Sequence, residues 1–156
     1  MLTLQKQDRE EAQTGTRPLT VTWSATDFAE VVRGQDTWEA EAAGSGGPIL
    51  VCDTDAFATP VWERRYLGDE ARLDAARLGV GDVYLLTHHD GVPFVQDGLR
   101  DGEHLRSTMT QEFASALITY QRPWALLTGS VDERVSLAMR IADQMMQRKL
   151  SFIPPI

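Results

Sequence analysis

The chain has 156 residues, 42% of them hydrophobic, which is enough for one domain with a buried core. Its net charge of −8 argues against nucleic acid as the main partner, because binding a phosphate backbone needs a basic surface. The single cysteine and the lack of an apolar leader or a membrane-length apolar run predict a cytoplasmic protein that does not enter a membrane.

A long helix is predicted first, over Asp27–Ala43, with Ser24 and Asp27 forming a helix-start box. Glycines and Pro48 end it before the apolar run Ile49–Cys52. This run is continuous rather than alternating, as are two later ones. Such runs are typical of strands buried on both faces of a parallel sheet. We therefore predict strands at Ile49–Cys52, Val83–Leu86 and Trp124–Leu127.

Helical patterns fill the intervals between these strands. Short helices are predicted over Thr59–Tyr66 and Ala71–Leu78, and a longer one over Arg106–Tyr120. The last helix begins with a capping box at Ser130 and Glu133 and continues as an i, i+4 apolar stripe.

The alternation of strands and helices predicts an α/β fold with a doubly wound, mostly parallel sheet. Sheets of this kind carry about five strands or more, so three strands leave the sheet incomplete on its N-terminal side. Residues 1–150 form one predicted domain. Residues 151–156 are expected to be a loose tail, because Pro154 and Pro155 cannot extend a helix.

Polar residues follow each predicted strand, at Asp53–Asp55, Thr87–Asp90 and Thr128–Ser130. In an open parallel sheet, ligands bind beyond the carboxyl ends of the strands. Asp53 is placed to hold Mg²⁺, and Asp55 is placed to accept a proton from a substrate hydroxyl. On the pattern alone, an Asp in this position more often caps the following turn.

The segment Gln96–Arg106 is rich in glycine and charge. Its arginines, Arg100 and Arg106, could close over phosphates as a lid, although a solvated surface loop is the commoner case. Trp62 and Phe94 are the aromatic residues best placed to stack on a ligand.

Two further candidates are interpreted structurally. His88 and His89 are adjacent, and adjacent side chains in an extended strand point in opposite directions. We therefore expect a surface turn there rather than a shared metal ion. Cys52 is expected to be a core residue of its strand rather than a nucleophile.

The sequence contains no Gly-x-x-x-x-Gly-Lys-[Ser/Thr] motif, the P-loop whose backbone N–H groups and lysine hold nucleotide phosphates. The lysines are Lys6 and Lys149, and the glycines of 44–47 precede a predicted strand instead of following one.

Five short motifs nevertheless occur in an order that resembles the ribosylnicotinamide kinase domain of the NadR type, a P-loop ATPase/kinase family. They span about Trp23 to Arg148, and they are Val51–Asp55 with Thr59–Gly68, Tyr84–Thr87, Val92–Phe94, Asp97–Arg100 and Gly129–Arg134.

The resemblance implies transfer of a phosphate from ATP to nicotinamide riboside, with Mg²⁺. By that resemblance Asp53 would serve the metal and Asp55 the riboside, and Arg100 and Arg106 would act from the lid. Thr54, Trp62, Phe94 and Asp97 would bind the substrate, and Ser130 and Arg134 would lie near the nucleotide.

In that family a P-loop strand lies between the strands predicted here at Ile49–Cys52 and Val83–Leu86. Without it, both strands would have an unpaired edge. We therefore expect the chain alone to be marginally stable or rearranged and, because the P-loop is missing, not to transfer phosphate. The alternatives are a regulatory remnant that binds a nucleotide or riboside without turnover, and a decayed gene fragment.

Overall fold

The computed structural model describes residues 22–79, 81–94 and 103–150. In chain order the elements are α2 (Ala25–Ser45), α3 (Thr59–Leu67), the 3₁₀ turns η1 (Gly68–Glu70) and η2 (Ala75–Arg77), β1 (Tyr84–Thr87), η3 (Glu103–Leu105), α4 (Arg106–Thr119), β2 (Trp124–Leu127) and α5 (Val131–Leu150).

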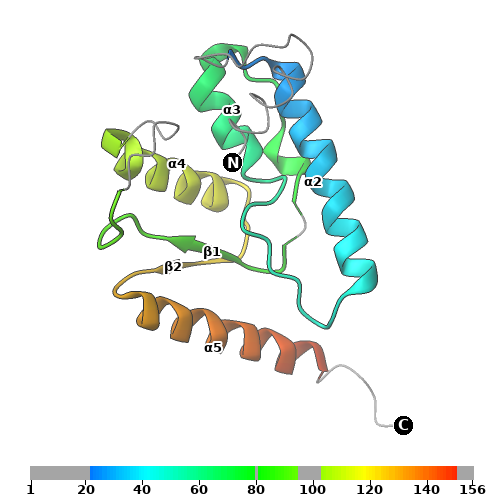
Figure 1. Cartoon of the computed structure of the whole chain (residues 1–156), viewed down its shortest axis with the longest axis vertical. Coiled ribbons are helices and arrows are strands. Elements are labelled where there is room, and N and C mark those ends of the chain that lie inside the picture. Colours follow the sequence, from blue (N-terminus) through cyan, green and yellow to red (C-terminus); the bar gives the residue numbers. More distant parts are fainter. Residues whose placement is uncertain (1–21, 80, 95–102, 151–156) are drawn as a thin grey trace, which may run out of the picture.

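The described residues form a helix-rich α/β structure around a small parallel sheet. β1 pairs with β2 in register, with Tyr84 opposite Trp124 and Thr87 opposite Leu127. Helix α4 covers one face of this sheet and α5 the other, while α2 and α3 pack together beside them (Figure 1). The strands predicted at Val83–Leu86 and Trp124–Leu127 are thus confirmed, the first with its start one residue later.

Local sequence signals set the starts of two helices, α2 and α5. The Ser24 side chain accepts a hydrogen bond from the Asp27 backbone N–H, and the Asp27 carboxylate bonds the Ser24 backbone in return. The same reciprocal pattern between Ser130 and Glu133 starts α5. Each box satisfies N–H groups that a helix start would otherwise leave unpaired, so both capping predictions are confirmed.

Two small clusters form the interior. Phe57, Ala75 and Leu117 are buried together, with the β1 and β2 side chains Tyr84 and Trp124 packed against them. A second cluster joins α2 to α3 through aromatic contacts, in which the Phe28 ring lies 5.0 Å from Trp23 and 6.1 Å from Tyr66.

The prediction of a strand at Ile49–Cys52 is wrong. The run has no strand conformation, and Ile49, Leu50 and Val51 are 47%, 46% and 84% exposed. A strand exists only where a neighbouring strand accepts its hydrogen bonds, and this segment instead crosses from α2 to α3 as an irregular loop (Figure 1). Cys52 is therefore exposed, which corrects its assignment to the core.

The helix predicted over Ala71–Leu78 is also wrong, since only the single turn Ala75–Arg77 forms. The Asp74 carboxylate accepts a 3.0 Å hydrogen bond from the Ala76 N–H. A local bond of this kind competes with helix formation by offering the backbone another partner.

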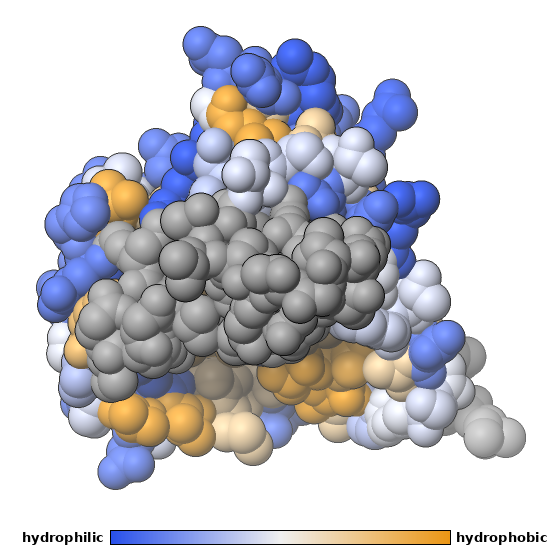
Figure 2. All heavy atoms as spheres, turned by 45° about the horizontal axis from the view of Figure 1, so that its top comes forward, coloured by the Kyte–Doolittle hydropathy of each residue, from blue (hydrophilic) through white to orange (hydrophobic). Residues whose placement is uncertain are grey.

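The surface of the described part mixes charged and apolar groups. Figure 2 shows hydrophobic clusters separated by hydrophilic side chains on one face. Among the described helices, none combines the length and the apolar character that crossing a bilayer requires. The tail at 151–156 lies outside the described residues.

Candidate functional site

The loops that leave β1 and β2 start side by side. Because the strands are parallel and in register, His88 and Thr128 emerge at the same edge of the sheet, and the His88 N–H donates to the Leu127 carbonyl at 2.9 Å. This carboxyl edge is where open α/β sheets bind ligands. Two of the three predicted polar strand ends are thus brought together.

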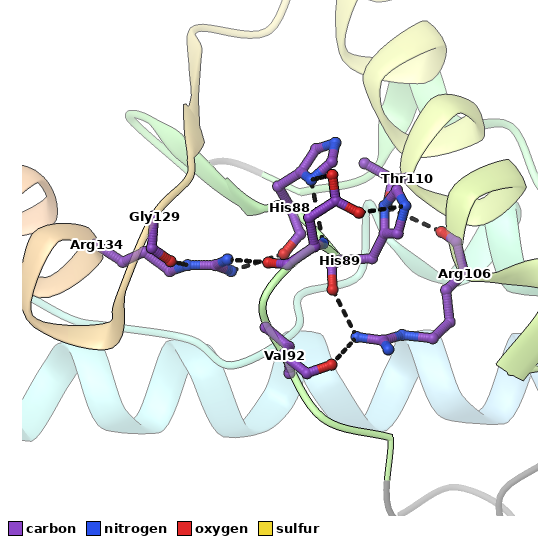
Figure 3. Close-up of polar contacts among 8 residues, drawn as sticks. His88, His89, Val92, Arg106, Thr110, Gly129 and Arg134 are labelled. Carbon is purple, nitrogen blue, oxygen red and sulfur yellow. Dashed lines mark hydrogen bonds and ion pairs between the residues drawn. The ribbon is translucent and has the colours of Figure 1, made fainter.

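Arg134 fastens these two loops to each other (Figure 3). Its side chain is only 8% exposed. Nε donates to the Gly129 carbonyl at 2.8 Å, while Nη1 and Nη2 donate to the carbonyls of His88 and Asp90, both at 2.6 Å. The guanidinium therefore ties the segment after β1 to the segment after β2.

Arg106 holds the same turn from the other side. It is the first residue of α4, and its Nη2 donates to the carbonyls of His89 and Val92, both at 2.8 Å. We call residues 88–92 the clasped turn, because four of its five carbonyls accept hydrogen bonds from one of these two arginines. Gly91 sits within it at a φ of 73°, a conformation that favours glycine.

Ser130 lies at the start of α5, where its hydroxyl and backbone N–H both donate to the Glu133 carboxylate. These hydrogen bonds, the backbone one foremost, lower the pKa of Glu133. Gly129 precedes them at a φ of 86°, and a Cβ there would come within 2.5 Å of the Glu133 Oε2. The tight turn between β2 and α5 therefore depends on glycine.

The clasped turn also gathers three possible metal ligands. The rings of His88 and His89 stack with centroids 4.4 Å apart, instead of pointing apart as the sequence interpretation assumed. One nitrogen from each ring and one Asp90 carboxylate oxygen lie within 4.8 Å of one another. The expected turn is present, but the expected direction of the two rings is wrong, because alternation applies only within a strand and both histidines follow the last residue of β1.

The first predicted strand end does not join this edge. The Asp55 Oδ2 accepts a 2.8 Å hydrogen bond from the hydroxyl of Tyr84, the first residue of β1, and its Oδ1 accepts from the Ala58 N–H at 3.3 Å. Burial, aided by the bond to Asp55, raises the pKa of Tyr84. Asp55 thus caps the turn before α3 and bonds to the residue that begins β1, whereas the clasped turn follows the end of that strand.

Asp53 and Thr54 are exposed in the loop before this turn, and the Thr54 carbonyl accepts a 3.4 Å bond from the Gln35 amide. Trp62 is half-buried and meets the Phe113 ring edge-on at 5.6 Å. Phe94 is half-buried just after the clasped turn. Asp97 and Arg100 lie outside the described residues.

The donor chemistry fits Mg²⁺ better than it fits a nucleotide triphosphate. The exposed Asp53 carboxylate offers the hard oxygen that Mg²⁺ prefers. Three described basic side chains already have other partners. Arg106 and Arg134 bond to backbone carbonyls, and Lys149 pairs with Asp82, which precedes β1. No phosphate-transfer step is therefore derived from this geometry.

Sequence reasoning missed one residue of this site. Thr110 bonds to His89 through its hydroxyl, and it stands four residues after Arg106, so the two share one face of α4. The four-residue spacing could have indicated that Thr110 lies on the same face as Arg106. That this face packs against the clasped turn is known only from the structure.

Comparison with known proteins gives one match. A family model described as an AAA domain matches residues 4–134, which covers most of the chain. No curated protein and no solved structure matches it.

Proposed function

Because the chain belongs to the AAA domain family, which makes it a P-loop ATPase-like nucleotide-binding domain, we propose that it is a domain of the ribosylnicotinamide kinase type. Its ligands are ATP with Mg²⁺ and a nucleoside such as nicotinamide riboside. We further propose that this polypeptide by itself binds these ligands without transferring phosphate.

The observation that carries the proposal is the converged carboxyl edge of β1 and β2. The polar loops that follow the two parallel strands lie side by side at this edge, and Arg106 and Arg134 hold them there through hydrogen bonds. This is the position at which folds of this architecture bind nucleotides and their substrates. Of the five ordered sequence motifs, Tyr84–Thr87 ends at this edge and Gly129–Arg134 begins there.

The proposed lack of turnover has a physical basis. Phosphoryl transfer depends on positioning the phosphates and neutralising their charge. The sequence contains no P-loop motif, and the two arginines at the edge are already bonded to carbonyls. In addition, Asp55 is bonded to Tyr84 rather than placed beside the clasped turn. The parts that would have to act together are therefore not assembled.

Thermal unfolding of the full chain with and without Mg-ATP, and with nicotinamide riboside added, tests binding directly. A ligand that binds only the folded state stabilises it by about 2.7 kcal/mol at a concentration about a hundredfold above Kd. For a chain of this size that raises Tm by roughly 5–10 °C. No shift with any of these ligands would show that the proposal is wrong.

A matched pair of variants tests the metal role. Asp53→Asn removes an exposed carboxylate at the proposed Mg²⁺ ligand, and Asp69→Asn removes one in η1, outside the proposed site. We expect Asp53→Asn to lose the Mg²⁺-dependent part of the shift and Asp69→Asn to keep it. Equal shifts in both variants would remove Asp53 from the site.

Mass spectrometry of the riboside after incubation with Mg-ATP tests turnover. We expect no phosphorylated riboside above a protein-free control. A product that accumulates in proportion to protein concentration would contradict the proposed lack of transfer while leaving the family assignment intact.

A further inference from the structure

We propose that the clasped turn is a binding site for a divalent transition-metal ion of the Zn²⁺ class, held by His88, His89 and Asp90. This site lies at the same edge of the sheet as the proposed nucleotide site, but it does not depend on nucleotide binding. Three features of the turn favour such a site: the proton positions around His89, the spacing of the donors and the rigidity of the backbone that carries them.

The Thr110 hydroxyl fixes the tautomer of His89. Thr110 Oγ1 donates its hydrogen to the Arg106 carbonyl at 2.9 Å, and the His89 Nδ1 lies 3.1 Å from the same oxygen (Figure 3). Because the hydroxyl hydrogen is already used, Oγ1 must accept, and Nδ1 must carry a proton. The neutral ring then presents a lone pair at Nε2.

That lone pair faces a carboxylate. The His89 Nε2 lies 3.3 Å from the Asp90 Oδ1. On the other side, the His88 Nδ1 lies 3.4 Å from the Asp90 Oδ2 and accepts a 3.2 Å hydrogen bond from the Asp90 N–H. The His89 Nε2 and the Asp90 Oδ1 are both acceptors, and at this separation they repel unless a cation lies between them. Either a proton or a metal ion could be this cation, and the set of donor atoms favours a metal ion.

One pair of donors has the spacing expected around a tetrahedral ion. Zinc binds histidine nitrogen and carboxylate oxygen at about 2.0–2.2 Å, which places neighbouring ligand atoms about 3.3–3.5 Å apart. The 3.3 Å separation between the His89 Nε2 and the Asp90 Oδ1 falls at this value, and a ring nitrogen of His88 belongs to the same cluster of ligand atoms, all within 4.8 Å of one another. Two imidazoles and one carboxylate suit zinc and its neighbours better than Mg²⁺, which prefers oxygen ligands.

The surroundings are those of a metal centre. Ligating histidines commonly donate their other ring N–H to a fixed acceptor, which orients the ring, and Thr110 does this for His89. A cleft of about 290 Å³ lined by both histidines, Arg106 and Thr110 gives access for the ion and for a water ligand. The four arginine hydrogen bonds hold the backbone of the turn in place. Metal binding would therefore cost little conformational entropy.

Isothermal titration of the full chain with Zn²⁺ tests the site. It is done in a Cys52→Ser background, because the exposed thiol is itself a zinc ligand. We expect one ion per chain, with binding lost in His89→Gln and in His88→Gln. The control is His104→Gln, which removes the third histidine, an exposed residue outside the cluster. The proposal is overturned by an absence of Zn²⁺ binding, or by binding that survives both cluster variants.

Thr110 provides a second, independent measurement. Thr110→Val removes the acceptor for Nδ1–H and should weaken Zn²⁺ binding by about 10–100-fold, while Thr110→Ser should restore it. Long-range ¹H–¹⁵N NMR of the metal-free chain should show His89 protonated at Nδ1 alone. Addition of Zn²⁺ should then shift its Nε2 resonance. A ring protonated on both nitrogens that Zn²⁺ leaves unchanged would identify the cation as a proton and overturn the proposal.

Discussion

Replacing Arg134 tests whether the clasp joins the two strands. Arg134→Met keeps the length and the apolar body of the buried side chain while removing its hydrogen bonds to Gly129, His88 and Asp90. Although bonds from a charged donor can contribute more, Gly129 and Asp90 are exposed, so water can replace part of each bond. At about 1 kcal/mol for each bond, the loss is about 3 kcal/mol.

Such a loss would be a large fraction of the roughly 5–15 kcal/mol that stabilises a typical domain. Urea unfolding followed by circular dichroism measures it, with an unchanged m-value showing that the same structure unfolds. The control is Arg140→Met, an exposed arginine on the same helix. If the two variants lie within about 0.5 kcal/mol of each other, the range expected for surface changes, the clasp does not stabilise the fold and the reasoning fails.

Three further predictions concern the rest of the structure. Phe57→Ala should lower the free energy of unfolding by about 3–5 kcal/mol, because it empties the centre of the main cluster, and a loss below about 1 kcal/mol in urea unfolding would contradict this. Tyr84→Phe should cost about 1 kcal/mol by removing the bond to Asp55. Since the pKa of Tyr84 is raised in the fold, this difference should hold below pH of about 10 and shrink above it, which unfolding at several pH values measures. Glu133→Gln should be less stable than the parent above pH of about 4.5, and this difference should disappear as the pH falls further. The reason is that the lowered pKa of Glu133 gives stability that is lost as the carboxylate of this capping box is protonated. A difference that persists at pH 2 would refute the prediction.

Much of the local structure follows from short stretches of sequence. The capping boxes at Ser24 and Ser130 fix the starts of two long helices, because their hydrogen bonds join residues three positions apart. The apolar runs at Val83–Leu86 and Trp124–Leu127 correspond to β1 and β2, although Leu85 and Leu126 remain 37% and 38% exposed. The capping boxes depend on residues that are close along the chain, and the strands are indicated by the apolar character of short runs.

Tertiary structure decided the rest of the fold. The run Ile49–Cys52 has the same apolar character as β1, yet no strand forms there. Strand formation requires a partner that accepts and donates backbone hydrogen bonds, and composition does not reveal whether one is present. Asp55 likewise has the sequence position of a catalytic acid but caps a turn and bonds to Tyr84.

In the candidate site, too, some features follow from the sequence and others only from the tertiary structure. Sequence alone indicated a P-loop-related α/β chain with polar groups after each of three predicted strands, and the structure showed that two of these strands exist and are neighbours. It pointed to Arg106 and Arg134 as important, but not to the carbonyls that they bind. Only the tertiary structure brought Thr110 to His89 and set His88 against His89. The physical reason is that strand alternation and helix periodicity are local rules, whereas the direction of a side chain beyond the end of a strand is set by the distant residues that hold its backbone.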